Sequence, residues 1–215
     1  MVAASFSHVK VWVFDLDNTL YHPSVRLFDQ IEVRMTNYVS SLLNISKEEA
    51  DHLRGHYWKQ YGTTLAGLMR EHEIEPMAYL EDVHDIDFSV LSPDPLLAER
   101  IACLPGRKIV YTNGSMPYAL NVLEARGLRD VFSAVYGVEH AGFRPKPEQA
   151  AFEAVFALDG VAPEEGAMFE DDIRNLMAPH AMGMRTVLVG PDFPHDVDHI
   201  HHHTRDLSDF LSHLG

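Results

Sequence analysis

The sequence predicts an α/β protein in which a parallel sheet, covered by helices on both faces, carries a helical insertion after its first strand. Five short apolar runs, rich in β-branched and aromatic residues, alternate with segments of helical periodicity. Such alternation is typical of parallel sheets. It is interrupted once, between about residues 20 and 104, where no strand-like run occurs and apolar residues recur at helical spacing. We interpret this stretch as an inserted cap.

The first predicted strand, residues 9–14, is an apolar run followed by turn-forming residues. In the insertion, apolar residues from Phe28 to Leu42 recur at helical spacing, and parts of residues 48–61 and 65–72 do the same. The later elements alternate as strands at residues 108–112, 134–137, 167–170 and 185–189 and helices at residues 118–126, 148–158 and 173–182. We expect a core domain of residues 1–20 and 105–215 and a cap domain of residues 21–104. The cap should cover the carboxyl ends of the strands, where open α/β sheets bind ligands.

At 215 residues the chain suits one domain with a sizeable insertion or two small domains. No apolar stretch approaches the ~18–20 residues that a transmembrane helix needs, and the first residues lack the regions of a signal peptide. The single cysteine, Cys103, cannot form an internal disulfide. It lies in the apolar pattern of Leu97, Ile101 and Leu104, which predicts a core position. We expect a cytoplasmic protein in a reducing compartment.

The formal net charge is −15 with the histidines neutral. Such a surface disfavours nucleic-acid backbones and anionic membranes as partners. An anionic substrate would need a local positive site, which a metal ion and one or two basic side chains can supply. From the charge we therefore expect neither a nucleic acid polymer nor a membrane as partner.

Asp15 and Asp17 follow the first predicted strand directly and carry the strongest functional signal. Side chains alternate across a strand, so these two acids project to the same side, roughly 6–7 Å apart. Carboxylates this close repel one another, and a divalent cation or a shared proton relieves the repulsion. A capped turn uses the same residue types, so the assignment depends on the other motifs.

Thr112, Asn113 and Gly114 end the second predicted strand ahead of a helix. Glycine lets the backbone approach a ligand, and the helix N-terminus offers free N–H groups, so together they can cradle an anion. Lys146 stands between two prolines before another helix. The backbone there is stiff, and the site is unfavourable for a cation unless an anion shares it.

Glu170, Asp171 and Asp172 lie at another strand end, before a helix. One acid at this position is ordinary helix capping. Three in succession exceed what a cap needs, and their repulsion is relieved most readily by a cation. Carboxylate oxygens are hard ligands of the kind that suits Mg²⁺.

In this order, the motifs resemble those of the haloacid dehalogenase (HAD) superfamily of phosphotransferases. The resemblance covers nearly the whole chain and implies a HAD-like Rossmannoid fold with a C1-type helical cap. More narrowly, residues 15–23, 61–64 and 169–171 resemble the pyrimidine 5′-nucleotidase subgroup. Asn175 departs from the pattern, since some members carry a further acid there. The matching positions are Asp15 and Asp17 for the first motif, Thr112 for the second, Lys146 for the third, and Asp171 with Asp172 for the fourth.

The resemblance implies a Mg²⁺-dependent phosphomonoesterase. Asp15 would attack phosphorus and form an aspartyl-phosphate, and Asp17 would protonate the leaving group and then deprotonate water. Lys146 would offset the remaining negative charge. The metal ligands would be Asp15, the backbone carbonyl of Asp17, and Asp171, with Asp172 or a water completing the shell. The phosphoryl group would be held by Thr112 and by the N–H groups of Asn113 and Gly114.

The resemblance implies a small phosphorylated metabolite as partner, and we expect a monomer or homodimer. Pyrimidine nucleoside 5′-monophosphates are the leading substrates that the resemblance suggests. A sugar-phosphate or phosphoglycolate phosphatase would use the same core beneath a differently lined cap. A dehalogenase is disfavoured, because it needs neither a second acid at position 17 nor a metal cluster. A non-catalytic phosphoryl-binding scaffold predicts the loss of one catalytic group, and none is missing from the motifs.

The cap offers four candidate substrate contacts: Arg34, Tyr61, Thr63 and Thr64. Arg34 lies on a helix face that a solvated surface explains equally well, and the other three could be plain loop residues. The C-terminal stretch is rich in histidine, at positions 195, 199, 201, 202 and 203. We expect it to be a solvated loop with adventitious affinity for metals.

Overall fold

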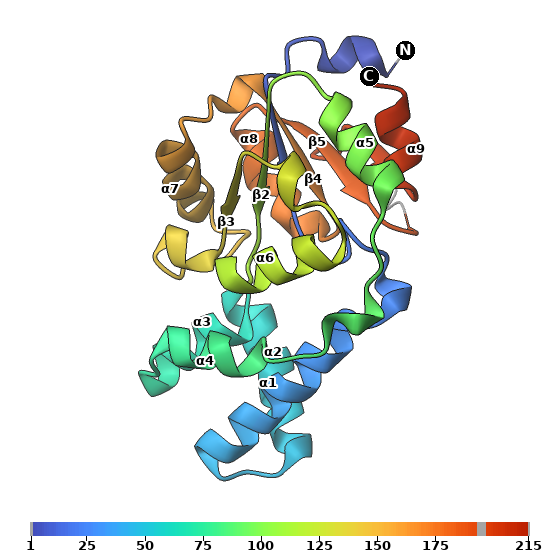
Figure 1. Cartoon of the computed structure of the whole chain (residues 1–215). Helices are drawn as coiled ribbons and strands as arrows, with labels where there is room; N and C mark the ends of the chain where they lie inside the picture. Colours follow the sequence, from blue (N-terminus) through green and yellow to red (C-terminus); the bar gives the residue numbers. More distant parts are fainter. Residues whose placement is uncertain (1, 193–196, 215) are drawn as a thin grey trace.

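The computed structural model describes residues 2–192 and 197–214, which contain a six-stranded sheet in the order β3-β2-β1-β4-β5-β6 (Figure 1). All neighbouring strands pair in parallel. The predicted fold class is therefore confirmed. The strands are β1 (Val11–Phe14), β2 (Arg107–Tyr111), β3 (Ala134–Tyr136), β4 (Gly166–Glu170), β5 (Arg185–Val189) and β6 (His202–Thr204).

Central strand β1 is buried on both faces, because its side chains alternate between two apolar layers. Trp12 and Phe14 belong to one layer, and Val11 and Val13 belong to the other. This double burial explains the uninterrupted apolar run in the sequence and fixes the point where the strand ends. The first layer includes α5 (Pro95–Cys103), α6 (Met116–Ala125) and α9 (Leu207–Ser212), and the second includes α7 (Gln149–Asp159) and α8 (Met177–Ala181).

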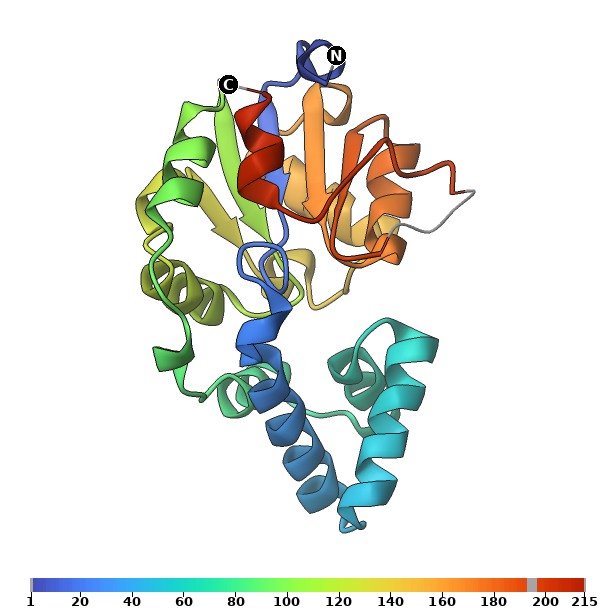
Figure 2. The same ribbon diagram turned by 90° about the vertical axis from the view of Figure 1, so that its right-hand side faces the viewer.

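The insertion after β1 forms a bundle of helices that lies beyond one end of the sheet, as Figures 1 and 2 show from two sides. Helix α2 begins with a capping box in which Ser46 and Glu49 satisfy each other's backbone N–H groups. Helices α2 and α3 approach so closely at Gly67 that a Cβ there would lie 2.2 Å from the ring of Tyr57. No helix in the described part of the chain is long and apolar enough to cross a membrane. The cap helices are α1 (Leu27–Leu43), α2 (Lys47–Tyr61), α3 (Thr64–His72) and α4 (Pro76–Val83).

Two chain segments connect the cap with the sheet, and Arg126 at the end of α6 binds both. Its Nε donates to the carbonyl of Leu20 at 3.1 Å. One terminal nitrogen donates to the carbonyl of Ser92, and the other lies 2.7 Å from the Asp94 carboxylate. Because a guanidinium presents its donors in a fixed plane, the entry to the cap and the exit from it are held together at this point.

Helix α5 lies with the sheet, where it contacts α9, and not with the cap bundle (Figure 1). We therefore propose that the cap ends after α4 and not at residue 104. Within α5, Cys103 is exposed, which corrects the expectation of a core position. Leu97, Ile101 and Leu104 are buried at helical spacing on the inner face, and a residue two positions after Ile101 points away from that face.

The histidine-rich stretch is not the loop that we expected, because His202–Thr204 forms β6 and pairs with β5. The histidines before this strand contact the core. Nε2 of His199 lies 2.9 Å from the carbonyl of Ile173, and Nδ1 of His201 lies 2.7 Å from the Thr186 hydroxyl. These side chains therefore have structural partners. His195 lies outside the described residues.

Candidate active site

The centre of the site is a buried ion-pair network between Lys146 and two carboxylates. Asp15 directly follows β1, and its N–H donates to the carbonyl of Phe169, which extends the pairing with β4 by one residue. Nζ of Lys146 lies 2.6 Å from Asp15 Oδ1 and 2.6 Å from Glu170 Oε2. It also donates to the carbonyl of Tyr111 at 3.2 Å. Lys146 and Glu170 are each 1% exposed and Asp15 is 5% exposed, so the network is shielded from water.

Burial and neighbouring charges set the protonation of this network. Burial opposes the charge of Lys146, but the Asp15 and Glu170 carboxylates outweigh it and raise the pKa of the ammonium. Burial raises the pKa of Asp15 to about 8, aided by the Glu170 charge and opposed by Lys146. The single positive charge of Lys146 therefore does not neutralise all the acids around it.

A third acid makes this excess of negative charge larger. Carboxylate oxygens of Asp15, Glu170 and Asp171 lie within 4.8 Å of one another. Burial and the Glu170 charge raise the pKa of Asp171 to about 10. A divalent cation would favour the ionised forms, and hard oxygen ligands suit Mg²⁺. The donor set therefore fits the predicted metal. Oδ1 of the buried Asn175 has no hydrogen-bond partner in the described chain, and Asn175 borders the same cavity as Lys146.

Asp17 is held by two tyrosines. The hydroxyls of Tyr21 and Tyr118 donate to the same oxygen, Asp17 Oδ1, at 2.6 and 2.5 Å. Burial raises the pKa of Asp17, while these two hydrogen bonds act in the opposite direction. Tyr118 in turn stacks on His84, which follows α4 of the cap, with 4.2 Å between ring centroids. The second oxygen of Asp17 remains available to a ligand, since Asp17 lines the cavity.

The second motif surrounds the end of β2. Gly114 N–H donates to the Thr112 hydroxyl oxygen at 2.9 Å, so this N–H already has a partner, unlike in our prediction. Asn113 binds the backbone of Lys146 twice, with its amide nitrogen 3.1 Å from the Lys146 carbonyl and its amide oxygen 2.7 Å from the Lys146 N–H. The Asn113 side chain therefore positions the lysine. The Thr112 hydroxyl hydrogen and the Asn113 N–H remain as candidate donors to a phosphoryl group.

Asp172 does not belong to the acidic cluster that the structure brings together. Its carboxylate caps the following turn and pairs with Arg174, with Oδ2 lying 2.5 Å from Nη2. Although burial opposes it, the Arg174 hydrogen bonds and charge hold the pKa of Asp172 below its ordinary value. The Arg174 guanidinium also lies over the ring of Trp58 from cap helix α2, 3.7 Å from its centroid. This stack joins cap and core beside the acidic cluster.

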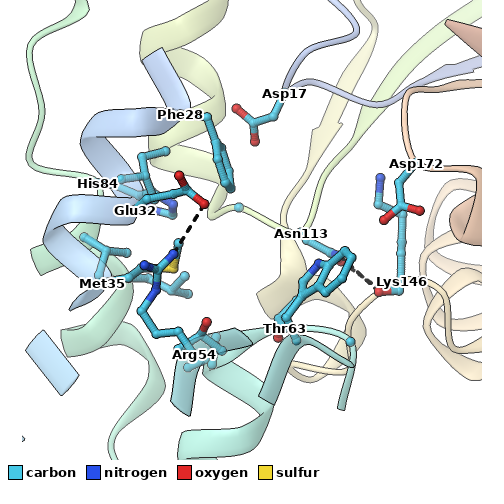
Figure 3. A pocket seen from close by; sticks show the side chains of 18 of the residues that line it. Asp17, Phe28, Glu32, Met35, Arg54, Thr63, His84, Asn113, Lys146 and Asp172 are labelled. Carbon is cyan, nitrogen blue, oxygen red and sulfur yellow. Dashed lines mark hydrogen bonds and ion pairs between the residues drawn. The ribbon is translucent and has the colours of Figure 1, made fainter. Parts of the chain in front are cut away.

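A cavity of about 430 Å³ lies between the cap and the acidic cluster. Its core wall includes Asp17, Asn113 and Lys146, and Figure 3 shows these residues facing Phe28 and Arg54 of the cap. A ligand in the cavity would therefore touch both the charged centre and the cap.

The structure places two of the four predicted cap contacts at this cavity: Thr63 and the buried Thr64 line it. The Thr63 hydroxyl also caps α3 by accepting from the Ala66 N–H. Arg34 and Tyr61 do not line it and have partners elsewhere in the cap. Arg34 binds the carbonyl and carboxylate of Asp85 on the outer side of α1, and the Tyr61 hydroxyl donates to Glu71 at 2.6 Å.

Three residues of the site were missing from our predicted set: Glu170, Tyr21 and Tyr118. Glu170 carried a signal, since it belongs to the run of three acids. Strand alternation could have indicated which of the three points toward Asp15. Tyr118 lies 101 residues from Asp17 in the sequence, and no spacing rule connects them.

An acidic centre at the edge of a parallel sheet, beneath an inserted helical cap, is the arrangement of a Rossmann-like α/β protein that binds its ligand at the carboxyl ends of the strands. The chain belongs to the haloacid dehalogenase-like hydrolases, because the model of that family matches residues 12–189. The match includes both predicted carboxylates of the first motif, Lys146 and the acidic run.

The chain is also similar to individual proteins. Phosphate metabolism protein 8 of Saccharomyces cerevisiae is 26% identical over 195 residues, covering 83% of this chain and 61% of the yeast protein. The chain thus spans less than two thirds of that relative's length. A HAD phosphatase from Thermococcus onnurineus matches with a TM-score of 0.63 and 20% identity, covering 96% of this chain and 98% of that one. The HAD-hydrolase YfnB from Bacillus subtilis, bound to magnesium, matches with a TM-score of 0.60 and 17% identity, covering 96% and 99%. At these identities the two structures show a shared fold.

Proposed function

We propose that the protein is a Mg²⁺-dependent phosphomonoesterase that hydrolyses pyrimidine nucleoside 5′-monophosphates through an aspartyl-phosphate intermediate. One observation carries the proposal: Asp15, at the end of β1, is paired with a buried lysine and adjoins two further acids beneath the cap cavity. A nucleophilic carboxylate, a fixed cation and a place for a metal thus meet where a phosphate ester can enter.

In the first step a carboxylate oxygen of Asp15 forms a bond to phosphorus, and the bond from phosphorus to the leaving oxygen breaks. Lys146 holds Asp15 at 2.6 Å and so keeps the other carboxylate oxygen in one orientation. The same ammonium stabilises the charge that spreads over the phosphoryl oxygens in the transition state.

Asp17 moves the protons. In its protonated form, which burial favours, it gives a proton to the leaving oxygen. Its carboxylate then takes a proton from the water that attacks phosphorus and releases Asp15. Tyr21 and Tyr118 bind one oxygen of Asp17 and direct the other toward the substrate. Asp17 is restored over the two steps, because the proton that it gives to the alcohol in the first is regained from water in the second.

The Thr112 hydroxyl and the Asn113 N–H would bind phosphoryl oxygens, and Asp15, Asp171 and the backbone carbonyl of Asp17 would hold the metal. The bound metal would supply Lewis-acid neutralisation of the acids and of the phosphoryl charge. The structure places Glu170 in the acidic cluster and pairs Asp172 with Arg174, so we assign Glu170 in place of Asp172 to the surroundings of the metal.

The substrate class rests on the cap and on the subgroup resemblance. The cavity wall combines apolar residues such as Phe28 and Met35 with polar groups, which suits a nucleoside better than a bare sugar. A sugar phosphate or phosphoglycolate remains the alternative substrate. We also propose that the enzyme acts in the cytoplasm, as a monomer or homodimer.

A screen of phosphomonoesters with the purified protein tests the proposal. We expect UMP and CMP to give the highest kcat/KM, activity to vanish in excess chelator, and Mg²⁺ to restore it. Full activity in chelator would refute the metal assignment. A preference for a sugar phosphate over every nucleotide would refute the substrate class and leave the phosphatase mechanism standing.

A further inference from the structure

The cap side of the cavity contains two buried polar atoms without a hydrogen-bond partner among the described residues. They are Nε of Arg54, on α2, and the hydroxyl of Tyr79, on α4. The two residues are 8% and 2% exposed, and both line the cavity. Buried polar groups without partners are rare and destabilise a fold. Unpartnered polar groups on residues that border a cavity point to a ligand that supplies the missing partners when it binds there.

The rest of the Arg54 guanidinium is fixed by the cap itself. Nη1 donates to the Thr36 hydroxyl at 2.6 Å and to the Asp51 carboxylate at 2.9 Å. Nη2 lies 3.5 Å from the Glu32 carboxylate. These contacts hold the plane of the guanidinium, and arginine keeps its charge at every relevant pH. The Nε–H is therefore a permanent and oriented donor.

Tyr79 lies close to this donor. Burial raises the pKa of its hydroxyl well above the ordinary value, while the Arg54 charge and the nearby Thr64 hydroxyl, which does not reach hydrogen-bonding geometry with Tyr79, act in the opposite direction. The side chain thus remains a phenol that can donate or accept a hydrogen bond. The ring of Tyr38 packs edge-on against it, with 4.9 Å between centroids, but Tyr38 is not part of the cavity wall.

Glu32 supplies a complementary acceptor. Its side chain is 53% exposed and lines the cavity, and Figure 3 shows its carboxylate directed toward Arg54. At 3.5 Å this ion pair is long, which leaves carboxylate lone pairs for a second donor. A donor beside an acceptor matches a planar ring edge on which a carbonyl or ring nitrogen adjoins an N–H group. Uracil and cytosine both have such an edge.

Apolar side chains are also available to pack on the faces of a planar ring, since Phe28 and Met35 line the cavity from α1 and Leu80 lines it from α4. Resting on the proposed function, we propose that Glu32, Arg54 and Tyr79, the cap polar cluster, determine specificity by binding the hydrogen-bonding edge of the pyrimidine ring. In this proposal the cluster binds the base of the leaving group, a role that the sequence had suggested for Arg34 and Tyr61.

Tyr79→Phe tests the proposal sharply, because it removes one hydroxyl that has no partner within the described chain. We expect KM for UMP to rise about tenfold, as for one sheltered hydrogen bond. The Tm should stay the same or rise, because an unsatisfied buried group is lost. Hydrolysis of acetyl phosphate, which has no base, should not change. Tyr38→Phe makes the same change on the neighbouring ring outside the cavity and is the matched control.

Glu32→Gln removes the charge of the acceptor on the other helix, and KM for UMP should again rise about tenfold with acetyl phosphate hydrolysis unchanged. Equal KM values for UMP in the Tyr79→Phe and Tyr38→Phe variants would overturn the proposal. Equal losses with UMP and acetyl phosphate would overturn it too, by showing that Tyr79 shapes the cap.

Binding separates this proposal from the proposed function. The Kd of UMP is measured with Asp15→Asn, which blocks turnover, with and without Tyr79→Phe. A tenfold rise of this Kd in Tyr79→Phe supports the cap polar cluster, even where the wild type hydrolyses no phosphomonoester and the proposed function fails. A Kd that does not change overturns the cluster, even where the enzyme is an active phosphatase.

Discussion

Replacing Lys146 by methionine should destabilise the metal-free protein strongly. The substitution keeps the length of the side chain and removes a cation whose Nζ lies 2.6 Å from both Asp15 and Glu170. All three side chains are at least nine-tenths buried, so water cannot replace the lost charge. Removing one partner of a buried ion pair costs about 3–5 kcal/mol. For a protein of this size, about 2–4 °C of Tm corresponds to each kcal/mol, so the loss should be about 6–20 °C.

The exposed pair of Lys10 and Glu165 provides a matched control. Its N···O distance is 2.5 Å, but the side chains are 69% and 44% exposed. Lys10→Met should therefore cost less than about 1 kcal/mol. The double variant Lys146→Met/Glu170→Gln should recover much of the loss, because it removes one of the two acids left without a counter-charge.

The assay is calorimetric unfolding in chelator at pH 7 and at pH 4.5. Without the Lys146 charge, which opposes the rise, the pKa of Asp15 goes up further in the folded state. The loss of stability should therefore grow as the pH rises above the ordinary range of carboxyl groups, near 4. A Lys146→Met variant no less stable than Lys10→Met would contradict this prediction. So would a loss in free energy of unfolding that is as large at pH 4.5 as at pH 7.

Four further predictions concern the catalytic groups and the cap. Asp15→Asn should abolish turnover without lowering the Tm, since the change is isosteric and reduces repulsion; substantial residual activity would exclude the covalent mechanism. Asp17→Asn should slow esters with poor leaving groups far more than activated aryl phosphates, because only the former need a proton in the transition state, and equal losses would contradict this role. Burial and the Glu170 charge raise the pKa values of Asp15 and Asp171 to about 8 and about 10, so the folded metal-free protein binds more protons than the unfolded chain from about pH 4 up to these values. Its free energy of unfolding should fall as the pH rises through that range. Mg²⁺ should consequently raise the Tm more at pH 8 than at pH 5.5, and equal shifts in scanning fluorimetry would refute the site. Trp58→Ala removes the stack on Arg174, and the contact is worth ~0.5–1 kcal/mol; KM for UMP should rise two- to fivefold, and an unchanged KM would show that the stack does not affect cap closure.

The sheet and the positions of the motifs could be predicted because both depend on local sequence. A parallel strand buried on both faces needs a continuous apolar run, and the residue that ends the run lies at the edge of the sheet. Asp15 and Glu170 could therefore be placed at the same edge before any contact was known. The identity of the acid that meets Lys146 depends on the side to which the last strand residue points.

The cap could not be predicted at the same level. Periodicity located its helices but gave no reason to prefer Glu32 over Arg34, which lie two positions apart on α1 and face different surroundings. Arg34 has a partner in Asp85 on the segment that leaves α4, and this pairing depends on tertiary packing. β6 was missed for a similar reason: three residues rich in histidine have no strand signal of their own and are ordered by the edge of β5.

The guanidinium of Arg126 restrains the two chain segments on which any movement of the cap depends. Because it anchors Leu20 and Ser92 to one point of α6, bending is left to the short stretches between these residues and the cap helices. Two adjacent pivots allow rotation about one axis and suppress twisting about others. A rotation there would shift Trp58, on cap helix α2, relative to Tyr118, which belongs to α6 of the core. The same rotation would change the distance between the cap wall of the cavity and the acidic cluster, and with it the access of water to Asp15.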